Sequence, residues 1–106
     1  MGLTAILRLD GRPAMLPDPS GGTFNAAGDF DRLLPLDPAT WPMLGQLDLH
    51  DIVTFTSADL DAVAAEVTQL LDTAVDGPEQ RGLLRLRELA RAGRHDAHAK
   101  LIVTGD

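Results

Sequence analysis

Cysteine is absent from this sequence of 106 residues. Its absence excludes a disulfide framework, thiolate catalysis and a zinc site built on cysteine. Tyrosine is absent as well, and one tryptophan and three phenylalanines are the whole aromatic content, so a core must be built mainly from leucine, valine and alanine. No apolar run approaches the ~20 residues of a membrane-spanning helix, and the first residues lack the layout of a signal peptide. We therefore expect a cytoplasmic protein with no membrane partner.

Basic residues are also scarce, with nine Lys and Arg against 16 Asp and Glu, for a net charge of −7. The excess lies in residues 1–77, where twelve acids face three bases for a net of −9, while residues 78–106 carry four acids and six bases for a net of +2. An acidic surface disfavours nucleic acid and favours a basic protein partner. Acidity also keeps a small protein soluble, which is its ordinary role.

The length fits a single domain, residues 1–106. Residues 11–46 hold six of the seven prolines and several glycines. A structureless loop of that length is uncommon in a compact domain, so we expect part of this Pro/Gly-rich region to be ordered. Residues 28–34 are predicted to form a short helix, and residues 37–41 a single turn with Asp37 as its cap.

The clearest predicted element is a helix over residues 57–75. Its apolar residues recur at gaps of three and four and make one stripe: Leu60, Val63, Ala64, Val67, Leu70, Leu71, Ala74 and Val75. The other face, with Asp59, Asp61 and Glu66, is expected to meet water. The stripe needs a sheet or a second helix to cover it.

Both ends of this helix carry sequence signals. Thr56 suits the N-cap, Asp59 is the capping partner three residues later, and Phe55 is spaced to pack on Leu60. Gly77 suits the left-handed position after the helix, and Pro78 cannot continue it.

Four segments are predicted as strands: residues 3–10, 43–49, 52–55 and 100–104. The second and third would form a hairpin around residues 48–51. A second helix is expected from Gly77 to Gly93, joined tightly to the first as an antiparallel pair. The order of strand, loop, strand, strand, helix, helix, strand predicts an α+β fold. In it, the helical hairpin packs on one face of a small, mostly antiparallel sheet of about four strands. Leu101, Ile102 and Val103 are consecutive, a pattern typical of a central strand with both faces covered, and the strand order is left open.

The three histidines are the candidates for catalysis or metal binding. His95 and His98 are spaced to reach one ion from a single helical turn, and His50 between Asp48 and Asp51 is placed as a general base. Two imidazoles are too few for a zinc site, and no serine stands in a nucleophile setting. We expect no metal and no cofactor. A metal-dependent or general-base enzyme using His50, His95 and His98 is the alternative.

Three segments together resemble short uncharacterised actinobacterial proteins: Phe30-Asp31-Arg32-Leu33-Leu34-Pro35-Leu36, Pro42-Met43-Leu44-Gly45-Gln46-Leu47-Asp48, and Gly77-Pro78-Glu79 with Gly82-Leu83-Leu84-Arg85-Leu86. The resemblance implies no activity and transfers no functional residue.

The leading hypothesis is a non-enzymatic, acidic protein-binding module, in the manner of an immunity protein or antitoxin that inhibits a basic partner. Its motivation is the acidic first three-quarters of the chain, the small size and the lack of a catalytic set. The residues expected to contact the partner surround the start of the main helix: Trp41, Asp48, Asp51, Asp59, Asp61 and Glu66. A homodimeric structural protein, with the arginines of the second helix paired to the acidic helix, is a further alternative.

Overall fold

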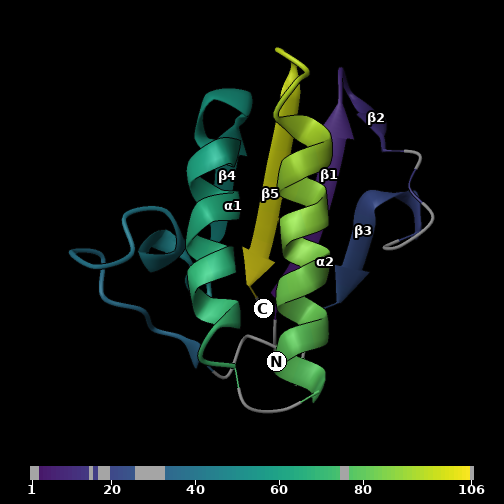
Figure 1. Cartoon of the computed structure of the whole chain (residues 1–106). Helices are drawn as coiled ribbons and strands as arrows, with labels where there is room; N and C mark the ends of the chain where they lie inside the picture. The colour runs from purple at the N-terminus through teal and green to yellow at the C-terminus, as the bar shows by residue number, and fades with distance from the viewer. Residues whose placement is uncertain (1–2, 15, 17–19, 26–32, 75–76, 106) are drawn as a thin grey trace.

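The structure, a computed structural model, describes residues 3–14, 16, 20–25, 33–74 and 77–105. It is an α+β fold in which two helices cover one face of an antiparallel sheet (Figure 1). The strand order is β2-β1-β5-β4, and β3 pairs with the same edge of β1 as β2 does. The sheet is therefore four strands wide, and the predicted fold class is confirmed.

The first strand, β1 (Leu3–Leu9), alternates as predicted, with every second side chain buried. It turns at Asp10 and Gly11 into β2 (Arg12–Pro13). Both turn residues have positive φ, at 54° and 79°, which is the geometry that a two-residue hairpin loop requires. The short β3 (Thr23–Asn25) then pairs with the first half of β1. Both short strands lie in the Pro/Gly-rich region, where only helical turns were predicted.

The centre of the sheet is β5 (Ala99–Gly105), which pairs with β1 on one side and with β4 (Ile52–Thr56) on the other. The place of β5 between two strands agrees with the three consecutive apolar residues Leu101 to Val103, but the helices cover only one of its faces (Figure 1). Alternate side chains of these strands bury against the helices, and the remaining ones point to the opposite, open face. Ile52 on that face is 62% exposed.

Helix α1 (Ser57–Leu71) begins where the sequence predicts, with Thr56 as N-cap in a capping box with Asp59. Its predicted end at Val75, with Gly77 as the residue after the helix, is wrong. The helix stops at Leu71, and the hydroxyl of Thr73 donates to the carbonyl of Leu70 at 3.1 Å. The last carbonyls of a helix have no hydrogen-bond donor within the helix, and the Thr73 hydroxyl supplies one here. The helix can therefore end before the predicted residue. Val75, which the predicted helix includes, lies outside the described residues.

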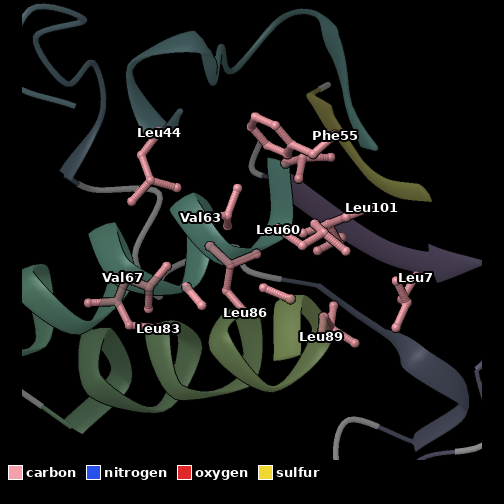
Figure 2. Close-up of a cluster of buried hydrophobic side chains, with 14 of the residues drawn as sticks. Leu7, Leu44, Phe55, Leu60, Val63, Val67, Leu83, Leu86, Leu89 and Leu101 are labelled. Atoms are coloured by element: carbon pink, nitrogen blue, oxygen red, sulfur yellow. The ribbon is translucent and has the colours of Figure 1, made fainter. Parts of the chain in front are cut away.

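Gly77 instead starts α2 (Gly77–Gly93), which runs antiparallel beside α1 (Figure 1). Proline fits this first turn because its missing N–H has no helical partner there. The two helices and the sheet enclose a core of leucine, valine, alanine and two phenylalanines. Its fully buried side chains (Figure 2) include Leu7, Phe55, Leu60, Val63, Val67, Leu83, Leu86, Leu89 and Leu101.

The strand predicted for residues 43–49 is wrong. Residues Leu44–Gln46 form a 3₁₀-helix, η3, and the expected hairpin with β4 is absent from residues 33–51. Leu44 and Leu47 are the buried residues here, and a gap of three suits a helical turn rather than a strand. The short helix predicted for residues 28–34 lies mostly outside the described residues.

Within the described ranges, no helix is long and apolar enough to cross a membrane.

Candidate functional site

The candidate site lies on residues 33–51, called the site loop below, which runs outside α1 and β4 (Figure 1). Its first turn is the one predicted at residues 37–41. The Asp37 carboxylate accepts from the N–H of Ala39 at 3.0 Å, and the Asp37 carbonyl accepts from the N–H of Trp41 at 2.8 Å. The prediction of an Asp37-capped turn is confirmed. An aspartate carboxylate that accepts a hydrogen bond from the backbone N–H two residues later stabilises the local conformation of a loop.

Glu66 of α1 holds the middle of the site loop. It is 8% exposed, and its carboxylate accepts hydrogen bonds from the N–H of Met43 at 3.0 Å and of Leu44 at 2.9 Å. These N–H groups open η3, where a helix has no internal partner for them, so Glu66 caps η3 from another element. The expectation that Glu66 meets water is wrong. Its role in this structure is to position the site loop.

A sequence signal for Glu66 exists. It lies three residues after Val63 and four before Leu70, on the apolar stripe itself rather than opposite it. A carboxylate there has to find hydrogen-bond donors in the interior. The sequence does not say which donors, because those of Met43 and Leu44 lie more than twenty residues earlier.

Two glycines let the site loop pack closely. A Cβ on Gly45 would lie 2.6 Å from the Cα of Pro38 in the first turn. A Cβ on Gly105, at the end of β5, would overlap the backbone of Leu49 and Asp48 far inside van der Waals contact. The Gly105 N–H also donates to the carbonyl of Asp51 at 2.7 Å. The site loop is thus fastened to α1 by Glu66 and to β5 by Gly105.

The two ends of the site loop line a hollow. Its apolar walls are Leu34, Pro35, Leu47 and Leu49, and its polar side is formed by Asp48 and His50. The hollow is open to solvent at one side and large enough for a single side chain. The sequence analysis missed its apolar walls, although Leu33 to Leu36 and Leu47 to Leu49 are apolar-rich segments in an otherwise polar loop.

Asp48 and Asp51 come from one turn beside this hollow. Asp48 accepts from the N–H of His50 at 2.8 Å, and Asp51 accepts from the N–H of Ile52 at 2.7 Å. Both residues are exposed. An ionised carboxylate has about four acceptor sites, so each retains capacity for a ligand. The two predicted acids are therefore held in place with oxygen atoms turned to solvent.

Trp41, the predicted anchor, is half-buried and packs against the hydrophobic core. Its backbone carbonyl accepts from the N–H of Gly45 at 2.7 Å, which ties the first turn to η3. Trp41 therefore belongs to the site loop, and its ring is in large part a packing element.

Asp59 and Asp61 lie at the other end of the sheet from Asp48 and Asp51. The Asp59 carboxylate accepts from the N–H of Thr56 at 3.0 Å, at the far end of β4 from Asp51. Five extended residues separate these ends by about 13 Å. Asp61 forms an exposed ion pair at 3.5 Å with Arg94, the residue that follows α2. The predicted acidic surface is thus two separate regions, and this pairing of α1 with an arginine occurs within one molecule.

The Asp59 cap has a measurable consequence. Replacing Asp59 with alanine is expected to lower the free energy of unfolding by about 1 kcal/mol, since the N–H of Thr56 loses its partner. Urea unfolding followed by circular dichroism measures the change. Asp61→Ala, two residues on, removes only an exposed ion pair with Arg94, so it is the control and should change stability by less than about 0.5 kcal/mol.

The histidines do not come together. His50 precedes β4 and His98 precedes β5, and these strands are antiparallel with Ile52 opposite Thr104. His50 and His98 therefore stand at opposite ends of β4, about 13 Å or more apart, too far to share one metal ion. Among the described residues, no group of three or more His, Asp or Glu is arranged to hold a metal ion. The Nε2 atom of His95 accepts a hydrogen bond from the Nε–H of Arg94 at 3.1 Å.

Comparisons with protein families, curated proteins and solved structures find no match for this chain.

Proposed function

We propose that this chain is a protein-binding module that docks a basic partner on the site loop, in the manner of an immunity protein or antitoxin. The observation that carries the proposal is the apolar hollow with Asp48 and Asp51 beside it. Asp59, Asp61 and Glu66 are not part of the proposed contact surface.

The hollow and the acids suit different parts of one ligand. An apolar side chain of the partner would enter between Leu34, Pro35 and Leu49 and lose its contact with water. An arginine or lysine next to it would bond the carboxylates of Asp48 and Asp51. Binding hot spots commonly combine a buried apolar anchor with charged groups beside it. The charges raise the association rate and the specificity of binding.

The fastening of the site loop supports the same proposal. A loop that is already ordered loses little conformational entropy when a partner binds. Glu66 and Gly105 supply that order without occupying the hollow. Binding loops held by a rigid scaffold are a frequent arrangement in recognition proteins.

The test is a reversal of charge in the site loop. Immobilised wild-type protein is expected to retain a partner from a lysate of its own host at low salt and to release it at high salt. The double variant Asp48→Lys and Asp51→Lys is expected not to retain this partner. The loss should exceed about tenfold in affinity once the partner is purified.

The matched control is Asp61→Lys with Asp72→Lys, which changes the net charge equally at an exposed position of α1 and at the exposed residue that follows it. Retention of the partner by the control and its loss by the site-loop variant would support the proposed surface. Equal loss in both variants would mean that only overall charge matters, and equal retention in both would show that the site loop is the wrong surface.

A further inference from the structure

A second hollow lies at one corner of the open sheet face, at the end of the molecule away from the site loop. Its floor is formed by side chains of the three main strands: Arg8, Thr56, Lys100 and Ile102. Its walls are formed by the β1–β2 turn, with Asp10 and Gly11, and by the residues around the start of β5, Ala97 to Ala99. Its volume of about 490 Å³ is in the range of small-molecule sites. In Figure 1 both helices lie in front of the sheet, so this face points away from the viewer.

Two cations face each other in this hollow. Arg8 and Lys100 are direct partners in the β1–β5 register, and both side chains leave the sheet on the open face, opposite the buried Leu7, Ala99 and Leu101. Like charges directly opposite on neighbouring strands destabilise a sheet. In the part of the chain that the structure describes, neither Arg8 nor Lys100 makes an ion pair. Among these described residues, no ion pair relieves the repulsion between Arg8 and Lys100, although the net charge of the protein is −7.

We propose that this hollow binds a small molecule through a phosphate group. A phosphate carries up to two negative charges and three acceptor oxygens, so one group can bond the Arg8 guanidinium and the Lys100 ammonium together and remove their repulsion. The exposed His98 ring at the wall supplies a further donor. The volume exceeds that of a bare phosphate and leaves room, over Ile102 and Gly11, for the group that carries it.

The proposal is independent of the site loop, because Arg8 and Lys100 lie beside Thr56 and not beside Ile52. Phosphate binding here would hold even if the site loop bound no partner. The phosphate site and the proposed protein-binding surface would then lie at opposite ends of one sheet.

The test is thermal unfolding and NMR titration with sodium phosphate and sodium pyrophosphate, against sodium chloride at the same ionic strength. The proteins are wild type, Lys100→Gln, Arg8→Gln and the control Arg91→Gln, which removes an equal charge from the exposed face of α2. For wild type and the control, we expect saturable stabilisation by phosphate, with pyrophosphate stronger and shifts at the Gly11 and Ala97 amides. For Lys100→Gln and Arg8→Gln, the dissociation constant should rise about tenfold or more.

The variants also test the like-charge pair. Without phosphate, Lys100→Gln should unfold at a temperature equal to or above that of wild type, because the repulsion is gone. The proposal would be overturned if phosphate stabilised all four proteins equally or if chloride had the same effect as phosphate. It would also be overturned if phosphate did not stabilise wild type.

Discussion

Glu66→Ala is expected to lower the free energy of unfolding by about 2–5 kcal/mol and to free the middle of the site loop. The N–H groups of Met43 and Leu44 lose the Glu66 carboxylate as their acceptor, and a buried donor left without a partner costs about 1–3 kcal/mol. Glu66→Gln keeps one acceptor oxygen and should fall between alanine and wild type.

Two signals from the same urea titration separate the loop from the whole fold. Trp41 is the only tryptophan and lies in the site loop, so its fluorescence reports on the loop, while circular dichroism reports on α1 and α2. In Glu66→Ala, the Trp41 emission should shift to the red before the helical signal is lost. The exposed Glu88→Ala is the control, with a change under about 0.5 kcal/mol. Wild-type stability and emission in Glu66→Ala would contradict the capping role.

Gly105→Ala is expected to lower the free energy of unfolding by about 2–3 kcal/mol and to weaken binding at the site loop. The added Cβ meets the backbone of Leu49 and Asp48, which cannot rotate away as a side-chain tip can. Either β5 or the turn of residues 48–51 must move, and the hydrogen bond from Gly105 to Asp51 is then stretched or lost.

Gly77→Ala is the matched control, since a Cβ there meets nothing within 4 Å. Chemical denaturation gives the stability of both variants, and amide shifts of residues 47–51 show whether the turn has moved. Unchanged shifts and unchanged stability in Gly105→Ala would mean that the close approach at Leu49 is not needed.

The parts of the fold that the sequence predicts are those decided by nearby residues. The start of α1 depends on Thr56 and Asp59, three residues apart, and β1 shows its two-residue period over its whole length. The three consecutive apolar residues Leu101 to Val103 are typical of a strand inside a sheet, which is where β5 lies. All of these signals lie within one short window of sequence.

The parts that the sequence does not predict depend on distant residues. Residues 43–49 have an acceptable strand pattern, but Glu66, more than twenty residues later, takes the N–H groups of Met43 and Leu44. The acids from Asp48 to Asp61 are neighbours in sequence, yet the extended β4 lies between them and divides them. The two hollows are likewise assembled from segments far apart in the chain.

The pairing of β1 with β5 also determines how the molecule responds to a pulling force. Leu3 lies opposite Gly105 and Leu9 opposite Ala99, so the start of β1 and the end of β5 are neighbours. Tension applied at these two points would be perpendicular to the strands and would load one pair of hydrogen bonds at a time, as in a zip. The first pair to open holds Gly105, which also bonds Asp51, so a small force would release the turn of residues 48–51 from β5 while Glu66 still held the middle of the site loop to α1.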